Sequence, residues 1–255
     1  MEELLRQPPP LDPPLMNAAG SLGFAPNLRI PSLWSEFGAF VTNPVSMQPR
    51  KPASGKRWQA FSGGVLLHSG YPNPGFWKVL EQFGPRWAQA PLPVIVHLLA
   101  SQPEELQRCV LELETAENIL AIEIGFPDAI GKQEAVQVIS AALGELPLIA
   151  RLPLTRSIEL APALIEAGVV AVSLAPPRGA LPMGDDVISG RLYGPALYPL
   201  ALQVVGELNQ AGVTVIGAGG IYHRQQVEGM HRAGAWAVQV DLALWRGDWL
   251  DLEEG

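Results

Sequence analysis

Residues 94–106, VIVHLLASQPEEL, join a short apolar run to the start of a helix. The run 94–100 is nearly continuously apolar rather than alternating, which is typical of a strand buried on both faces of a parallel sheet. Ser101 is placed to cap the helix, Pro103 falls in its first turn, and the glutamates that follow suit the positive end of the helix dipole. The stretch predicts a strand that passes directly into a helix.

The same unit recurs along the chain. Similar apolar runs predict eight strands, at 15–20, 39–44, 94–100, 121–127, 148–154, 171–176, 213–220 and 237–244. Helical periodicity follows most of them, at 75–89, 103–117, 132–144, 157–167, 196–211 and 224–233. Gly168 and Gly234 stand where two of these helices should stop. Repeated alternation of strand and helix predicts an α/β fold of the (β/α)₈ TIM barrel type.

Two places depart from the simplest barrel. Residues 45–93, between the second and third strands, exceed what a crossover needs and predict a long insertion. After the last strand only LWRGDWLDLEEG (244–255) follows, so the C-terminal helix is expected to be shortened or missing. Trp245 and Trp249, four residues apart in this segment, are expected to cover either the barrel side or a partner subunit.

Composition limits the classes of protein to which the chain can belong. It has 255 residues, 48% of them hydrophobic, and shows no linker, charge block or short repeat, so residues 1–255 are expected to form a single barrel domain. The net charge is −8, and the 17 Lys and Arg residues are scattered, which argues against binding of nucleic acid.

The expected location is the cytoplasm. Cys109 is the single cysteine, so no internal disulfide can form, and its helical setting favours a buried structural thiol. The N-terminal stretch MEELLRQPPPLDPP lacks the basic start and apolar core of a signal peptide. No run reaches the ~18 apolar residues that a membrane span requires.

Chemistry in this fold is expected at the C-terminal ends of the strands. GAGG (217–220) could hold an anion through backbone N–H groups or form a plain tight turn. Polar residues at the other strand ends and loops are Asn43, His68, Asn73, His97, Glu123, Asp128 and Arg151. Glu123 and Arg151 lie inside strands, where they form either a structural charge pair or a functional site. The four histidines show no metal-ligand spacing, so no metal is expected.

The order and spacing of several stretches resemble the class 1 dihydroorotate dehydrogenases over residues 11–245. The stretches are PLMNAAGSLGF, GAFVTNPVSMQPRKP, GGVLLHSGYPNPG, VIVHLLASQPEEL, GRLYGPALYPLALQVV and VIGAGGIYHRQQVEGMHRAGAWAVQVDLAL. The resemblance implies an FMN-dependent oxidoreductase of pyrimidine biosynthesis, a cytoplasmic (β/α)₈ barrel that forms homodimers. Its small-molecule substrate would bind at the barrel mouth.

Part of the flavin site matches that family. The small residues that the family packs against the flavin correspond to Ala18, Ala19 and Gly20. Gly219 and Gly220 correspond to the pair whose backbone binds the FMN phosphate. These five residues are therefore predicted to contact the cofactor.

Residues that would contact the pyrimidine or the flavin ring depart from the family. Asn73 corresponds to an asparagine that holds the pyrimidine, but Asn43 replaces a lysine that touches both flavin and substrate. His68 stands in place of an asparagine, and Arg151 in place of the lysine that faces the flavin ring. The resemblance assigns Asn43, His68 and Asn73 to the substrate and Arg151 to the cofactor.

The catalytic base of the family is also absent. AIEIGFPDA (121–129) occupies the segment in which the family carries a cysteine that removes a proton as hydride passes to the flavin. Phe126 stands at that position and cannot accept a proton. Glu123 and Asp128 replace two asparagines that grip the pyrimidine, and they are the candidate substitutes for the base. Two carboxylates there would repel the orotate anion unless they are protonated or paired, for example with Arg151.

The residues that correspond to the family's FMN phosphate site are altered as well. In GRLYG (190–194), Gly190 is retained, whereas Arg191 replaces a second glycine; both are assigned to the cofactor. Asp241 and Leu242 replace a Gly-Thr pair that contacts the phosphate. If one carboxylate charge lies ~5 Å from one phosphate charge, their repulsion at an effective dielectric of about 20 makes phosphate binding less favourable by about 3 kcal/mol. Arg191 could offset this if its side chain points inward.

Three functional hypotheses follow. The first is an FMN oxidoreductase of the dihydroorotate dehydrogenase type. The second is a non-catalytic pseudoenzyme that serves as a scaffold or assembly subunit for a protein partner. The third is a repurposed enzyme that uses Glu123, Asp128, Arg151 and His68 on another small molecule. Because the family base is missing, standard dihydroorotate oxidation is not expected.

Overall fold

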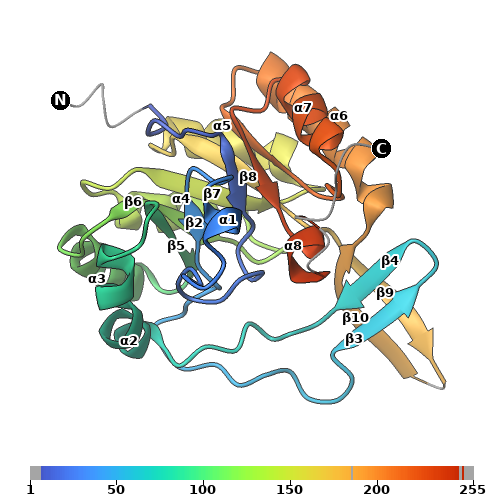
Figure 1. The fold of residues 1–255 in the computed structure, drawn as a ribbon, viewed down its shortest axis with the longest axis horizontal. Coiled ribbons are helices and arrows are strands. Elements are labelled where there is room, and N and C mark those ends of the chain that lie inside the picture. The colour runs from blue at the N-terminus through green and yellow to red at the C-terminus, as the bar shows by residue number, and fades with distance from the viewer. Residues whose placement is uncertain (1–6, 185, 247–248, 250–255) are drawn as a thin grey trace.

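The computed structural model describes residues 7–184, 186–246 and 249, and its centre is a ring of eight parallel strands (Figure 1). The strands are β1 (Leu15–Asn17), β2 (Phe40–Val41), β5 (Val94–Leu99), β6 (Ile119–Gly125), β7 (Leu148–Pro153), β8 (Ala171–Ala175), β11 (Val215–Ala218) and β12 (Ala237–Val240). They pair in the order β1-β12-β11-β8-β7-β6-β5-β2. A parallel bridge between Met16 and Ala39 joins β1 to β2 and closes the ring. The predicted TIM barrel is confirmed.

Helices surround the strand ring, as Figure 1 shows. They are α1 (Pro31–Trp34), α2 (Phe76–Ala88), α3 (Pro103–Glu114), α4 (Lys132–Ala142), α5 (Ser157–Glu166), the 3₁₀ turn η2 (Pro195–Leu197), α6 (Tyr198–Gln210), α7 (Arg224–Arg232) and α8 (Leu242–Arg246). Gly168 and Gly234 follow the C-caps of α5 and α7 with φ of +111° and +103°. Glycine adopts this left-handed conformation without steric cost, so both predicted helix stops are confirmed.

One predicted helix cap is wrong. Helix α3 begins at Pro103, and its N-cap is Gln102 rather than Ser101. Proline favours the first helical position because its missing N–H has no partner to lose there. The residue directly before Pro103 therefore becomes the cap, and it makes no side-chain capping hydrogen bond.

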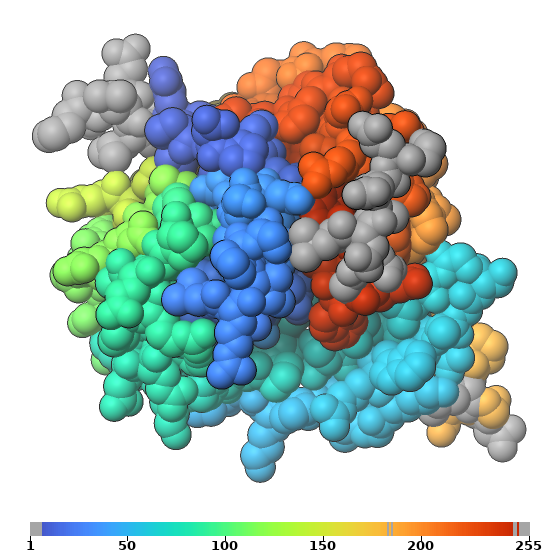
Figure 2. Space-filling view, viewed as in Figure 1, coloured from blue at the N-terminus to red at the C-terminus, as the bar shows by residue number. Residues whose placement is uncertain are grey.

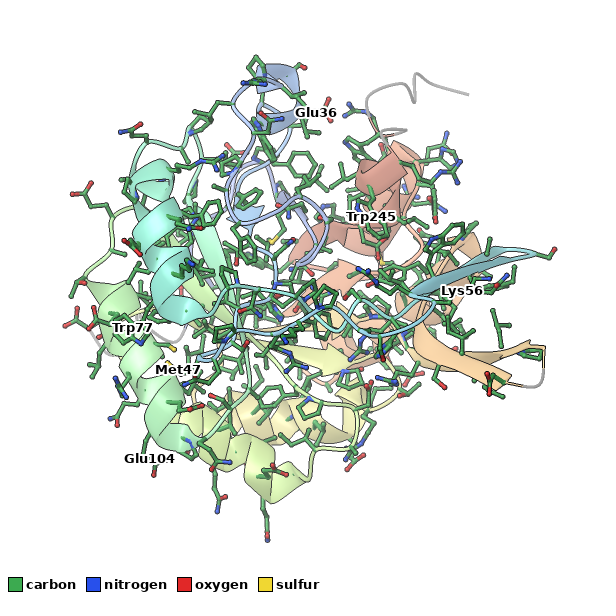
Figure 3. The ribbon with its side chains drawn as sticks, turned by 90° about the horizontal axis from the view of Figure 1, so that it is seen from below. Glu36, Met47, Lys56, Trp77, Glu104 and Trp245 are labelled. Carbon is green, nitrogen blue, oxygen red and sulfur yellow. The ribbon has the colours of Figure 1, made fainter. Side chains whose placement is uncertain are left out.

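The long insertion after β2 contains a hairpin of β3 (Trp58–Phe61) and β4 (Gly64–Leu67). A second hairpin, β9 (Arg178–Met183) and β10 (Asp186–Tyr193), follows β8 and was not predicted. Together they form an antiparallel sheet in the order β3-β4-β10-β9, which projects from one side of the barrel (Figures 1 and 3). The predicted insertion is confirmed, and the sheet places β10 residues beside the barrel mouth.

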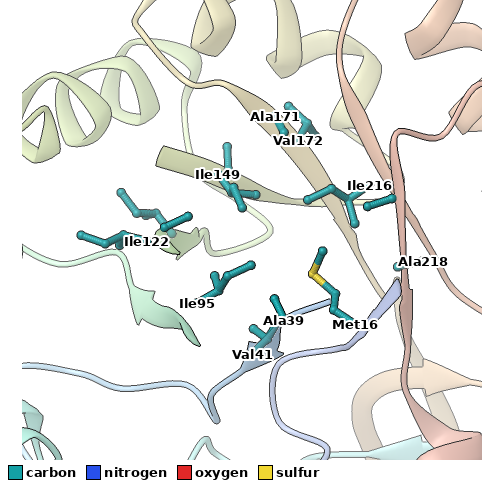
Figure 4. Packing of buried hydrophobic residues seen from close by; sticks show 14 of the residues in the cluster. Met16, Ala39, Val41, Ile95, Ile122, Ile149, Ala171, Val172, Ile216 and Ala218 are labelled. Atoms are coloured by element: carbon teal, nitrogen blue, oxygen red, sulfur yellow. The ribbon is translucent and has the colours of Figure 1, made fainter. Parts of the chain in front are cut away.

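The barrel interior is layered because residues two apart on a strand point to the same side. An apolar layer comprises Ile95, Ala121, Ile149, Ala171 and Ala237, all buried. Two residues further along the same strands lies a polar layer of His97, Glu123, Arg151, Ser173 and Gln239, also buried. Figure 4 shows Met16, Ile95 and Ile149 gathered inside the ring. The polar layer is the one nearer the C-terminal ends of the strands.

The two C-terminal tryptophans lie in different environments. Trp249 is buried, and its Nε1–H donates to Glu36 Oε2 at 3.0 Å, so it covers the barrel side. Trp245, on the five-residue helix α8, is 54% exposed. Figure 2 shows the N-terminal part of the chain between the α2–α3 region and the α8 region on this face. Residues 247, 248 and 250–255 of the predicted C-terminal segment lie outside the described residues.

No helix in the described part of the chain is long and apolar enough to cross a membrane.

Candidate functional site at the barrel mouth

Glu123 is the centre of the polar layer. It is fully buried, and its Oε1 accepts hydrogen bonds from Ser173 Oγ at 2.6 Å and Gln239 Nε2 at 2.8 Å. Its Oε2 lies 2.5 Å from His97 Nδ1 and 3.6 Å from Arg151 Nη1. A buried carboxylate is tolerated when its lone pairs are satisfied in this way. The predicted pairing of Glu123 with Arg151 is present, and it belongs to a larger network.

The pKa values of the network define its charge state. Burial opposes ionisation of Glu123, but the hydrogen bond from His97 and the charge of Arg151 outweigh it and lower its pKa to about 2. Burial lowers the pKa of His97 below its ordinary value, although the hydrogen bond to Glu123 favours the charged ring. Near neutral pH the layer therefore combines an ionised Glu123, a charged Arg151 and a neutral His97.

A cavity of about 500 Å³ lies above this layer. Its lining comprises Ala19, Pro44, Arg50, Tyr71, His97, Leu99, Ala100, Gly125, Phe126, Pro127, Asp128, Ala129, Arg151, Ala175, Pro176, Arg178, Arg191 and Tyr193. These residues come from the strand ends and the loops that follow them, from the long insertion, and from the antiparallel sheet. The volume falls in the range of about 300–1,000 Å³ that is typical of small-molecule sites.

Arg191 of β10 ties the antiparallel sheet to the barrel at this cavity. Its Nη1 and Nη2 donate to the two carboxylate oxygens of Asp128 at 3.1 and 3.2 Å. Its Nε donates to the Tyr71 hydroxyl at 2.9 Å, and Nη1 also donates to the Pro176 carbonyl at 2.6 Å. Arg178 Nη1 lies 3.9 Å from the same Asp128 carboxylate. Arg191 thus points inward, and its partner is Asp128.

The structure brings some predicted site residues together around the cavity. Those on its wall are Ala19, Phe126, Asp128, Arg151 and Arg191. Glu123 lies beneath the cavity and does not line it. Since its carboxylate oxygens already have four partners within the barrel, Glu123 is placed to support its neighbours and not to touch a ligand.

The three residues assigned to the substrate do not line this cavity. Asn43 Oδ1 accepts the N–H of Gly23 at 3.1 Å and holds the loop after β1. Asn73 Oδ1 accepts the N–H of Gly75 at 3.0 Å, and its Nδ2 donates to Ser46 Oγ at 3.0 Å. His68 is exposed after β4. In this structure the two asparagine amides organise loops.

The phosphate end predicted from the family is only partly preserved. Gly219 and Gly220 have positive φ values of +114° and +69°, so this turn keeps a glycine backbone. Gly220 packs against the turn before α6, where an added Cβ would come within 2.5 Å of the Tyr198 backbone nitrogen. Gly190 is similarly close to β4, at 2.5 Å from the Leu67 carbonyl oxygen to an added Cβ. The two glycines are required by packing, whatever they bind.

The space beside Asp241 does not fit an FMN phosphate. The cavity that Ala19, Gly20, Tyr193 and Asp241 help to line measures about 20 Å³. Asp241 is buried, which raises the pKa of its carboxyl group, and its Oδ1 accepts the Leu242 N–H at 2.5 Å. Ala18, next to these residues, is also buried and lines neither cavity. The space beside Asp241 in this structure is therefore smaller than a phosphate group, and the Asp241 carboxyl group lies in its wall.

Several residues that line the cavity were not predicted from the sequence to have a functional role. His97 was recognised as a polar strand-end residue, but its partner Glu123 is 26 positions away, and only the register of β5 with β6 reveals the pair. Arg50, Tyr71, Arg178 and Tyr193 reach the cavity from the insertion and from the unpredicted β9–β10 hairpin. The described residues contain no group of three or more His, Cys, Asp or Glu side chains that could hold a metal.

Comparison with known proteins identifies the family. Residues 10–146 match the dihydroorotate dehydrogenase family, and the chain belongs to it. By homology this is a family of pyrimidine-biosynthesis oxidoreductases, and FMN is a cofactor compatible with membership.

The chain is similar to catalytic subunits of bacterial dihydroorotate dehydrogenase B (NAD(+)). It is 29% identical over 254 residues to that of Geobacillus sp. (strain WCH70), covering 90% of this chain and 80% of the relative. It is 30% identical to the subunit of Pelobacter propionicus, covering 90% and 83%, and 29% identical to that of Bacillus thuringiensis, covering 90% and 82%. The resemblance found in the sequence is confirmed.

Proposed function

We propose that the mouth of this barrel binds a small anionic molecule, and that the chain does not oxidise dihydroorotate by the usual route of its family. The charge of the cavity carries the first part of the proposal. Arg50, Arg151, Arg178 and Arg191 line it, and Asp128 is the one carboxylate among the described lining residues.

The excess of positive charge is notable in a chain whose net charge is −8. The cavity has four guanidinium groups but only two nearby carboxylates, Asp128 in the wall and Glu123 beneath it, which leaves two positive charges uncompensated. Arginine presents paired N–H donors that match a carboxylate or a phosphate, and a partly enclosed cavity focuses their field. A small anion is the ligand that such a wall favours.

Phe126 supports the second part of the proposal. It stands at the position of the family's base, is 4% exposed and lies in the cavity wall. A phenyl ring can neither accept nor deliver a proton, and general-base catalysis typically contributes about 10²–10⁴-fold to a rate. The narrow space beside Asp241 adds a second obstacle, because the family reaction needs the flavin in place.

Association with a partner is a second proposal, favoured by exposed aromatic side chains. Trp58 and Phe61 of β3 and Trp245 of α8 are 57%, 38% and 54% exposed. The relatives are named as subunits, so a homodimer or a complex with another protein is compatible with the comparison. Light scattering during size-exclusion chromatography would give a mass of one chain if this second proposal is wrong.

We infer a cytoplasmic location, in keeping with the single buried Cys109.

Calorimetric titration with orotate tests the anion site, with uracil as an uncharged analogue of the same ring. Orotate should bind and uracil should not, and binding should weaken as salt rises. Arg178→Gln should weaken orotate binding about tenfold, because one charge-assisted contact contributes about 1.5 kcal/mol. The matched control is Arg29→Gln, an exposed arginine away from the cavity. Equal binding of orotate and uracil, or equal effects of both substitutions, would contradict the proposal.

A further inference from the structure

His97 lies at the boundary between the polar layer and the mouth cavity. It is 3% exposed, yet it lines the cavity. The next strand passes it at Gly125, where an added Cβ would overlap the Nε2 atom. Glycine at this position therefore leaves room for the Nε2 edge of the ring.

The hydrogen bond to Glu123 defines which nitrogen carries the proton. An ionised carboxylate can only accept, so Nδ1 must donate across the 2.5 Å contact, and this assignment follows from the network. The described residues provide no partner for Nε2, and they contain no unpaired buried side-chain nitrogen or oxygen, so Nε2 is open to the cavity. A neutral ring held this way presents a lone pair to a ligand.

Burial keeps the ring neutral, against the effect of the neighbouring Glu123 carboxylate. Glu123 of β6 favours the protonated ring, whereas Arg151 of β7 and Arg191 of β10 disfavour it. Burial is the largest cause and the two arginines act in the same direction, so the pKa of His97 lies below its ordinary value. A neutral imidazole at physiological pH is the state that a base requires.

We propose that His97, oriented by Glu123, is a general base at the floor of the cavity, acting on a small carboxylate that has an acidic C–H bond beside a carbonyl group. Nε2 takes the proton, the C–H electron pair remains on the ligand as an enolate, and Arg151 stabilises the negative charge. Return of the proton gives exchange or isomerisation, with no oxidant or flavin. The inference rests on the proposed anion site.

Nuclear magnetic resonance of the ¹⁵N-labelled full chain tests the state of the base without a ligand. His97 should show a protonated Nδ1 and an unprotonated Nε2 at pH 7, with signals assigned by their loss in His97→Gln. Glu123→Gln should weaken this preference, since a neutral amide accepts a weaker hydrogen bond. A ring protonated at Nε2, or at both nitrogens, at pH 7 would overturn the proposal.

Proton transfer itself is tested with dihydroorotate in D₂O, in the absence of FMN. The protein should speed exchange of the protons beside the ring carbonyl, measured by ¹H NMR, and His97→Gln should reduce that rate enhancement by about 10²–10⁴-fold. His223→Gln, at the exposed start of α7, is the matched control and should leave the rate unchanged. Equal rates for wild type and His97→Gln would overturn the general base.

Orotate titration distinguishes a failure of the proposed anion site from a failure of the general-base role of His97. If wild type and His97→Gln bind orotate with similar affinity and only exchange is lost, His97 acts in proton transfer and the proposal is supported. If wild type does not bind orotate, the anion site fails, and the ring state of His97 still decides whether a base is present. If His97→Gln loses orotate binding together with exchange, His97 is a ligand contact, and the general base is overturned.

Discussion

Replacing Glu123 with alanine should lower the free energy of unfolding by about 3–5 kcal/mol, because breaking one side of a buried ionic network leaves the other side uncompensated. The substitution removes the acceptor for His97, Ser173 and Gln239 at once. It also leaves the buried guanidinium of Arg151 without its carboxylate. Urea unfolding followed by circular dichroism measures the loss.

Two variants separate this network effect from ordinary loss of a side chain. Glu117→Ala removes an exposed carboxylate and should change stability by less than about 0.5 kcal/mol. Glu123→Leu combined with Arg151→Met replaces both charges by apolar groups and should recover part of the loss, since the unpaired charge is removed too. A decrease below about 1 kcal/mol for Glu123→Ala would show that the network contributes little.

The same network makes stability depend on pH. The pKa of Glu123 is lowered to about 2, so its contribution is fully present above the ordinary carboxyl pKa and is lost as pH falls toward about 2. His97 acts in the same direction: its lowered pKa means that the unfolded chain binds more protons, and stability falls as pH drops below about 6.5.

Replacing Asp241 with asparagine should raise the affinity for FMN by up to about a hundredfold. The substitution removes a negative charge beside the predicted position of the cofactor phosphate. At a separation of ~5 Å and an effective dielectric of about 20, the repulsion between one carboxylate and one phosphate charge is about 3 kcal/mol, which corresponds to about a hundredfold in affinity. Arg191 does not neutralise Asp241, because both of its terminal nitrogens bind Asp128. Quenching of FMN fluorescence gives both dissociation constants.

The pH dependence of FMN binding adds an internal check. Burial raises the pKa of Asp241, so wild-type affinity should increase as pH falls and the carboxyl group becomes neutral. Asp241→Asn should lack that increase. Glu228→Gln, an exposed acidic residue on α7, is the charge-matched control and should leave FMN affinity unchanged. Equal affinities for wild type and Asp241→Asn would show that packing, rather than charge, governs the site.

The barrel was predictable because its strands are buried on both faces and read as continuous apolar runs. Rules based on local sequence predicted some helix ends but not others. The stop at Gly168 is confirmed, whereas the cap predicted at Ser101 is wrong. The β9–β10 hairpin escaped prediction because it lies at the barrel mouth, outside the strand-helix alternation.

The site was less predictable, because its contacts join distant parts of the chain. Glu123 and Arg151 can be recognised in the sequence as buried charges, and a pair between them is one of the predicted alternatives. The contact of Asp128 with Arg191 spans 63 positions and depends on the unpredicted hairpin. That residues 1–255 form one domain stays a prediction, as do the roles of Asn43, His68 and Asn73.

Anaerobic mixing of dihydroorotate with the protein in excess FMN tests the central claim most directly. The absorption of oxidised flavin between 300 and 550 nm should stay constant, because the narrow space beside Asp241 disfavours the flavin phosphate and the proton that His97 removes returns to the ligand without hydride transfer. A catalytic subunit of dihydroorotate dehydrogenase B (NAD(+)) serves as the positive control. Bleaching of the flavin, with orotate formed in equal amount, would contradict the account.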